Sequence, residues 1–150
     1  MQNGNFIPPS QLLNFPELPD LDEIGEVLVL RTPGSASINE SIGIGFLTKN
    51  HHLDFKDFIS PDFALVLLLR GSGLYVDAVG REYPLSAGST FMRLPDVAHS
   101  NYVNINSGYV ECCIELGPRL YEVLTTMGFL QTSPPVHRIE LGNFEIPRRI

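Results

Sequence analysis

The most informative part of this sequence runs from residue 62 to residue 99 and reads DFALVLLLRGSGLYVDAVGREYPLSAGSTFMRLPDVAH. Short runs of aliphatic, aromatic and β-branched residues alternate with glycine-containing turns, and a single histidine closes the segment. Strands of about 5 residues joined by tight turns are typical of a small antiparallel barrel. A barrel of this size can enclose one small ligand, so its interior is where a metal, a substrate or an effector would bind.

The flanking sequence extends the same pattern. We predict strands at residues 27–31, 42–47, 63–70, 74–78, 81–85, 90–94, 109–116 and 136–141, with a further strand beginning at His99. The segment 63–70 is apolar on both faces, which indicates a buried central strand. Leu120, Val123, Leu124 and Met127 share one face of a helix, so the spacing predicts a helix over 119–127 packed on the outside of the barrel.

Composition narrows the class of protein. The chain has 150 residues, of which 43% are hydrophobic, and its 13 glycines and 12 prolines favour a fold with many turns. The net charge is −7, and the basic residues are scattered except for Arg148 and Arg149. A surface that binds nucleic acid needs clustered cations, so we expect that this chain alone does not bind DNA.

The only cysteines are Cys112 and Cys113, which are adjacent in sequence. Neighbouring residues of a strand point to opposite faces, so these two are poorly placed to bridge each other. Free thiols favour a cytoplasmic location, and no signal-peptide pattern is visible. The longest strictly apolar run, residues 63–69, is far shorter than the about 20 residues that span a bilayer, so we expect no membrane partner.

Two regions follow from these patterns. Residues 1–24 carry four prolines and several acidic residues and are interpreted as an N-terminal arm or a linker. Residues 25–150 are interpreted as a single barrel domain that includes the helix.

Four motifs carry a family resemblance. They are GSG at 71–73, GREYPLSAGS at 80–89, PDVAH at 95–99 and GPRLY at 117–121. Together they resemble the cupin superfamily and, more narrowly, the N-terminal effector-binding and dimerisation domain of AraC-type transcription regulators. The resemblance covers about residues 55–130. It implies a mainly β, double-stranded β-helix (jelly-roll) barrel with one or two C-terminal helices packed outside, through which the domain dimerises.

The resemblance also bears on metal binding. Enzymatic cupins hold a metal with two histidines and a glutamate from one strand and a histidine from a later strand. His99 matches the later histidine, but residues 55–70 contain no histidine or glutamate, and His51 and His52 lie too early. One imidazole does not hold a catalytic metal. We therefore expect no metal, no other cofactor and no enzymatic activity, with a small cupin isomerase or dioxygenase, or a ligand-free cupin, as the alternatives.

A candidate ligand site emerges from strand alternation and from the resemblance. Alternation places Glu111 and Cys113 on one face of their strand, and His99 and Asn101 on one face of theirs. In sugar-binding members of the family, the positions that match Asn101, Glu111, Cys113 and Lys56 line the pocket, and the position of His99 lies at the barrel mouth. The predicted ligand-binding residues are therefore Lys56, His99, Asn101, Glu111 and Cys113.

Alternatives stay open for this site. His99 could be a hydrogen-bonded structural residue, Lys56 a solvated lysine and Glu111 a surface carboxylate. In that case Val110, Cys112 and Ile114 would face an apolar interior instead.

The predicted function is sensing of a small polar, sugar-like effector by a homodimeric regulator domain. Residues 129–150 are too few and too rich in proline for the helix-turn-helix units of such regulators. DNA binding would therefore come only from a C-terminal domain that is absent from this chain.

Overall fold

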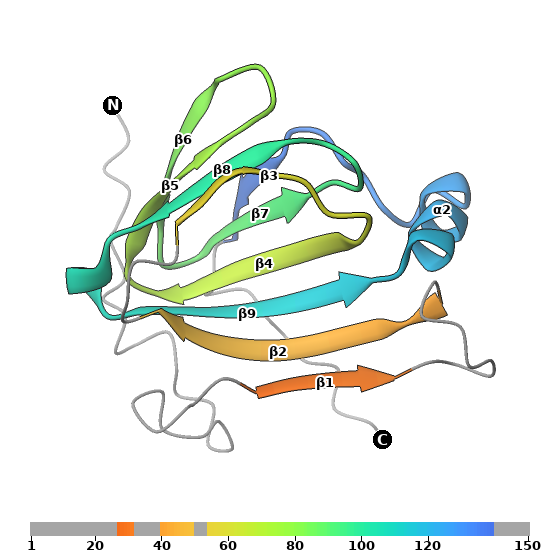
Figure 1. Cartoon of the computed structure of the whole chain (residues 1–150), viewed down its shortest axis with the longest axis horizontal. Coiled ribbons are helices and arrows are strands. Elements are labelled where there is room, and N and C mark those ends of the chain that lie inside the picture. The colour runs from red at the N-terminus through yellow and green to blue at the C-terminus, as the bar shows by residue number, and fades with distance from the viewer. Residues whose placement is uncertain (1–26, 32–39, 50–53, 140–150) are drawn as a thin grey trace.

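Two antiparallel β-sheets face each other in the computed structural model, which describes residues 27–31, 40–49 and 54–139 (Figure 1). The described strands are β1 (Val27–Arg31), β2 (Ile42–Lys49), β3 (Phe55–Phe58), β4 (Phe63–Arg70), β5 (Ser72–Val76), β6 (Glu82–Ser86), β7 (Ser89–Arg93), β8 (His99–Val103), β9 (Tyr109–Leu116) and β10 (Val136–Arg138). One sheet has the order β1-β2-β9-β4-β7-β10 and the other the order β3-β8-β5-β6. The predicted N-terminal arm, residues 1–24, lies outside the described residues.

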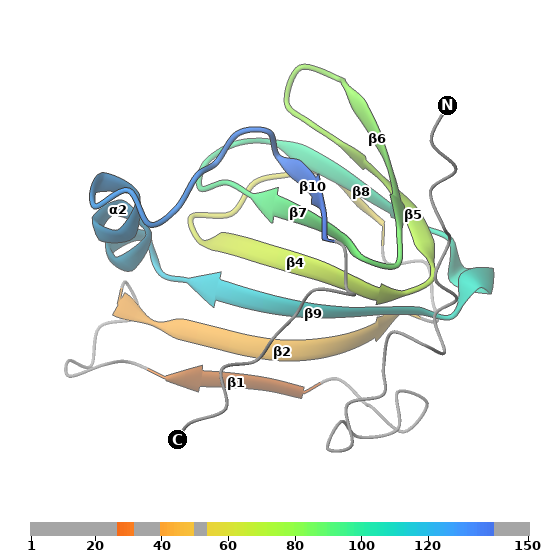
Figure 2. The ribbon, with the colours of Figure 1, turned by 180° about the vertical axis from the view of Figure 1, so that it is seen from behind.

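The connections make this arrangement a double-stranded β-helix. The chain leaves the six-stranded sheet after β4, forms the β5–β6 hairpin in the other sheet, returns as β7, crosses again to β8 and returns as β9. Seen from behind, β10 lies beside β7 and closes one edge of the larger sheet (Figure 2). The predicted fold class, a mainly β jelly-roll barrel with an external helix, is confirmed.

Glycines make two of the sharp turns possible. Gly71 joins β4 to β5 with a φ of +96°, and a Cβ there would lie 2.8 Å from the Cα of Tyr109. Gly88 joins β6 to β7 with a φ of +87°. Positive φ values of this kind strongly favour glycine, which explains why glycines separate the strand segments in the sequence.

The core lies between the sheets because alternate residues of each strand point inward. Ala64, Val66 and Leu68 of β4 are buried there, whereas Phe63, Leu65 and Leu67 face the outside of the larger sheet. The inner cluster contains Ala64, Val66, Leu68, Tyr75, Leu85, Phe91, Tyr109 and Cys113. Strand β4 is the central buried strand that the sequence predicts.

The helix α2 (Pro118–Thr126) covers one end of the outer face. Leu120, Tyr121 and Leu124 pack against a cluster that includes Phe63, and the Phe63 and Tyr121 rings stack with centroids 5.1 Å apart. Packing outside the barrel is as predicted, although the helix begins and ends one residue earlier than 119–127. Within the described residues, no helix is long and apolar enough to cross a membrane.

Several boundaries differ from the prediction. Strand β3 was not predicted, and its backbone is irregular because Asp57 has a positive φ of 48°. The polar loop expected at 104–108 contains a 3₁₀ helix, Ile105–Ser107, which Asn104 caps by accepting a hydrogen bond from the Asn106 amide. The last strand stops at Arg138, short of the predicted end at residue 141, which lies outside the described residues.

Candidate functional site

Strand β9 turns its polar residues toward the space between the sheets. Glu111 is 3% exposed and Cys113 is 1% exposed, and Cys113 belongs to the inner core cluster. On the opposite side of the strand, Ile114 is 39% exposed. The predicted orientation of Glu111 and Cys113 is therefore the one in the structure, and the alternative with Val110, Cys112 and Ile114 inside is wrong.

Strand β8 contributes two more buried polar side chains from the facing sheet. His99 is 3% exposed and Asn101 is 2% exposed. The His99 ring stacks on Tyr75, with centroids 5.8 Å apart, and meets the edge of Phe58 at 5.6 Å. These aromatic contacts fix the imidazole in the interior.

Strand β2 adds a buried cation that the sequence analysis missed. Lys49 Nζ lies 3.1 Å from Glu111 Oε1, and both side chains are 3% exposed. The same ammonium lies 5.1 Å from the centroid of the Phe55 ring and 5.4 Å from that of Tyr109. A carboxylate and two aromatic faces therefore surround this charge, which is the environment that makes burial of an ammonium tolerable.

A second ion pair lies at the other end of the interior. Arg93 Nη2 donates a hydrogen bond to Glu115 Oε1 at 3.2 Å. Both residues are register partners of Ala64 on the strand between them. The small Ala64 side chain leaves the room for this contact across the central strand. The pair is less buried than the first, with Arg93 14% and Glu115 33% exposed.

Several polar atoms in this interior are buried without a hydrogen-bond partner. In the described part of the chain they are His99 Nδ1, His99 Nε2, Asn101 Oδ1, Tyr109 Oη, Glu111 Oε2 and Arg93 Nε. Tyr109 Oη lies close enough to Asn101 and Glu111 to interact electrostatically, but forms no well-aligned hydrogen bond with either. Buried polar atoms are nearly always paired in folded proteins, so this concentration indicates a place for a polar ligand or water.

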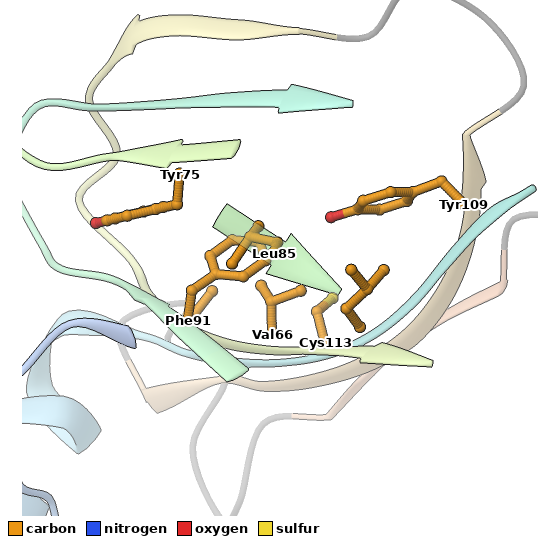
Figure 3. Close-up of a cluster of buried hydrophobic side chains, with 8 residues drawn as sticks. Val66, Tyr75, Leu85, Phe91, Tyr109 and Cys113 are labelled. Atoms are coloured by element: carbon orange, nitrogen blue, oxygen red, sulfur yellow. The ribbon is translucent and has the colours of Figure 1, made fainter. Parts of the chain in front are cut away.

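Apolar side chains from both sheets line the middle of the interior. Val66 and Phe91 project from the larger sheet, and Tyr75 and Leu85 project from the smaller one (Figure 3). In the same view the Tyr109 hydroxyl points toward the middle of this cluster. The interior is therefore apolar along its middle and polar where the unpaired atoms of His99, Asn101, Tyr109, Glu111 and Arg93 lie.

Burial changes the acid–base properties of the interior groups. It lowers the pKa of His99, and the positive charge of Arg93 lowers it further, against the opposing effect of the Val97 carbonyl. Burial raises the pKa of Tyr75 to about 12 and that of Cys113 to about 11, and it raises the pKa of Tyr109 as well. At neutral pH His99 is therefore an uncharged imidazole that can both donate and accept a hydrogen bond.

Four of the five predicted site residues come together in the interior, and one does not. Lys56 lies on β3 and is exposed, apart from the other four. The residues that sequence reasoning missed are Lys49, Tyr109 and Arg93. Tyr109 has the same strand parity as Glu111, so alternation alone could have found it. Lys49 shares the parity of the inward-facing Leu47, but it lies beyond the predicted end of that strand at residue 47.

The described side chains do not form a recognisable metal-binding site. Among the described residues, no three histidine, cysteine, aspartate or glutamate side chains lie close enough together to hold a metal ion. The expectation of a metal-free protein stays a prediction.

Comparison with known proteins supports the fold only. No family model matches the chain, and no curated protein sequence matches it. An uncharacterised conserved protein with a double-stranded β-helix domain from Klebsiella pneumoniae aligns over 79% of this chain and 94% of its own, with 12% identity and a TM-score of 0.48. An RmlC-like cupin protein from Desulfovibrio desulfuricans aligns over 79% of this chain and 97% of its own, with 15% identity and a TM-score of 0.42.

A DMSP lyase is also similar, over 51% of this chain and 38% of the lyase chain, with 14% identity and a TM-score of 0.41. This chain therefore matches well under half the length of that enzyme. The structural neighbours are thus cupin-like double-stranded β-helix proteins. They give no support to the AraC-type assignment, which stays a proposal.

The expectation that this chain is not an enzyme is corrected by the same comparisons. DMSP lyases and a salicylate 1,2-dioxygenase from Pseudoaminobacter salicylatoxidans are among the structural neighbours. The sequence argument inferred a lack of activity from missing metal ligands. Missing metal ligands do not exclude an activity, because the structural neighbours include enzymes.

Proposed function

We propose that this chain binds a small, uncharged, hydroxyl-rich molecule between its two sheets. The observation that carries the proposal is the set of buried, unpaired polar atoms on His99, Asn101, Tyr109 and Glu111. Leaving such a group unsatisfied costs about 1–3 kcal/mol, so a ligand that pairs several of them gains affinity. The aromatic and aliphatic walls suit the carbon skeleton of a sugar or another polyol.

A binding screen tests this proposal. Pentoses, hexoses and polyols would be screened by thermal shift, and each hit measured by titration calorimetry. We expect at least one of them to bind, and Asn101→Leu to abolish that binding because it removes a buried acceptor while keeping similar volume. The matched control is Asn106→Leu, which changes an exposed asparagine. Equal loss of affinity in both variants, or no binding by any compound, would refute the proposal.

We further propose that this binding serves as sensing by an AraC-type regulator domain. The support is the resemblance carried by the motifs at 71–73, 80–89, 95–99 and 117–121. In this proposal the domain is a cytoplasmic homodimer, and ligand binding controls DNA contacts made by a C-terminal domain outside this chain. Extension of the gene's reading frame into a helix-turn-helix segment, together with DNA binding that depends on the ligand, is the result we expect.

A catalytic use of the same interior is the second candidate. It is favoured by His99, whose two ring nitrogens are unpaired and whose lowered pKa keeps it uncharged and able to accept a proton at neutral pH. Incubation of the protein with each bound compound, followed by product analysis, distinguishes catalysis from sensing. A product that forms with the wild type but not with His99→Gln would establish catalysis.

A further inference from the structure

We infer that the Lys49–Glu111 ion pair sets the charge selectivity of the interior, so that uncharged polyols bind and analogues carrying a carboxylate are rejected. This inference rests on the proposed function, because it concerns which members of a ligand class the interior accepts. Lys49 acts in it as a positioning residue for Glu111 rather than as a ligand contact.

The first step is the charge balance of the interior. Lys49 and Arg93 are its described cations, and each has a carboxylate within 3.2 Å, Glu111 and Glu115 respectively. His99 adds no charge at neutral pH, because burial disfavours its protonated form. The described interior is therefore neutral. An anionic ligand would bring a buried charge without a counterion, which is strongly unfavourable.

The second step is the hydrogen-bonding capacity of the unpaired atoms. Asn101 Oδ1 and Glu111 Oε2 can only accept, whereas Tyr109 Oη can donate or accept. Arg93 Nε can only donate. A hydroxyl group both donates and accepts, so the hydroxyls of a polyol can pair with Asn101, Tyr109 and Glu111. A carboxylate only accepts, so it could pair with Tyr109 Oη but would repel Asn101 Oδ1 and the negatively charged Glu111 Oε2 beside it.

The third step is the role of Lys49. Its ammonium binds Glu111 Oε1 and rests over the Phe55 and Tyr109 rings. These contacts hold the Glu111 carboxylate in one orientation and leave Oε2 as its unpaired atom. Lys49 thereby cancels the charge of Glu111 without consuming its second acceptor. Removing the carboxylate alone would leave the Lys49 charge without its counterion and shift the ligand preference toward analogues that carry a carboxylate.

Two matched ligand pairs test the inference. D-glucose and D-glucuronate, like D-galactose and D-galacturonate, share a ring and differ only in a hydroxymethyl or carboxylate group. Titration calorimetry at pH 7 on the full chain should show that the neutral member of a pair binds at least about tenfold more tightly, a difference of about 1.4 kcal/mol. Glu111→Gln should shift this ratio at least about tenfold toward the uronate, because Lys49 then lacks its counterion.

A double variant separates charge from folding. Lys49→Met/Glu111→Gln restores a neutral interior with nearly the original volume, so the preference for the neutral sugar should return. Glu122→Gln, a change at an exposed helix position, is the matched control and should leave the ratio unchanged. Circular dichroism and thermal melts confirm that each variant is folded.

Each outcome has a distinct meaning. Uronate binding equal to or tighter than that of the neutral sugar would overturn the inference but keep the proposed function. A ratio that Glu111→Gln leaves unchanged would overturn the role of the ion pair. Binding of neither member of either pair, together with a negative polyol screen, would overturn the proposed function itself.

Discussion

Tyr75 and His99 stack face to face between the two sheets, with ring centroids 5.8 Å apart and an angle of 17° between the planes. The imidazole is 3% exposed, the Phe58 ring meets it edge-on, and the positive charge of Arg93 acts on it. Protonation would therefore place a charge in a buried site lined by aromatic rings, where the positive charge of Arg93 also acts. The folded protein consequently binds this proton less readily than the unfolded chain does.

We expect the free energy of unfolding to fall as the pH is lowered through about 6.5, the pKa of an unperturbed histidine. The sign follows from the lowered pKa of His99. Below pH 6.5 the imidazole is protonated in the unfolded chain but still neutral in the folded protein, so acid favours unfolding. The effect ends once the pH falls below the pKa of His99 in the folded state. Urea unfolding at pH values from 5 to 8 measures the effect. His99→Leu should flatten the curve in this window relative to wild type, and His137→Leu, at an exposed position, should not.

The Lys49–Glu111 pair gives a prediction about stability. Lys49→Met leaves the Glu111 carboxylate buried without its counterion, which should reduce the free energy of unfolding by about 3–5 kcal/mol. Lys49→Met/Glu111→Leu removes both charges and should recover most of that loss. Arg119→Met is the control, because Arg119 is 71% exposed in its pair with Glu40, and it should cost less than about 1 kcal/mol. Equal costs for the two single variants would contradict the prediction.

Metal content is a third prediction. We expect elemental analysis of the purified protein to find no stoichiometric Fe, Mn, Ni or Zn. The reason is that, among the interior residues that the structure describes, only His99 matches a cupin metal ligand, and catalytic sites keep at least three protein ligands. About one metal ion per chain, lost in His99→Ala, would contradict this expectation and favour the enzyme candidate.

Self-association is a fourth prediction, and it concerns α2 and the residues after it. Leu120, Tyr121 and Leu124 pack on the barrel, but Val123 is 45% exposed and Met127 is 63% exposed. An apolar surface of this kind favours contact with a second chain. We expect sedimentation velocity to show a dimer at high protein concentration, weakened by Val123→Arg but not by Glu122→Arg. A monomer at all concentrations would count against the AraC-type assignment.

Strand periodicity explains how much could be predicted. Strand β4 was predicted with its observed bounds because it is a long apolar run that ends at Arg70 and Gly71. Strand β9 was predicted with its observed bounds because Gly108 and Gly117 flank a run in which charged and apolar residues alternate. Strand β3 was missed because its four residues, FKDF, are too few and too polar for a periodic pattern, and because a backbone irregularity interrupts its pairing. Local pattern thus predicts long strands well and short irregular ones poorly.

The site was predicted only in part for a related reason. Parity along one strand correctly placed Glu111 with Cys113, and His99 with Asn101, because that property is local. The partnership of Lys49 with Glu111 joins residues far apart in the sequence through the β2–β9 register, which composition and spacing do not reveal. Lys56 was placed at the site by a family position, and the structure leaves it exposed.

The last prediction concerns the two adjacent cysteines, whose side chains lie on opposite faces of the larger sheet. Both are free, and Cys113 is 1% exposed in the inner cluster while Cys112 lies on the outer face of the sheet. Burial raises the pKa of Cys113 to about 11, so little thiolate is present at pH 8. Cys113 should therefore react with a disulfide reagent at least about tenfold more slowly than Cys112, as measured on the Cys112→Ser and Cys113→Ser variants. A saturating ligand between the sheets should slow Cys113 further and leave Cys112 unchanged, since only Cys113 faces the proposed site. A ligand that protects Cys112 instead would place binding on the outer face and contradict an interior site.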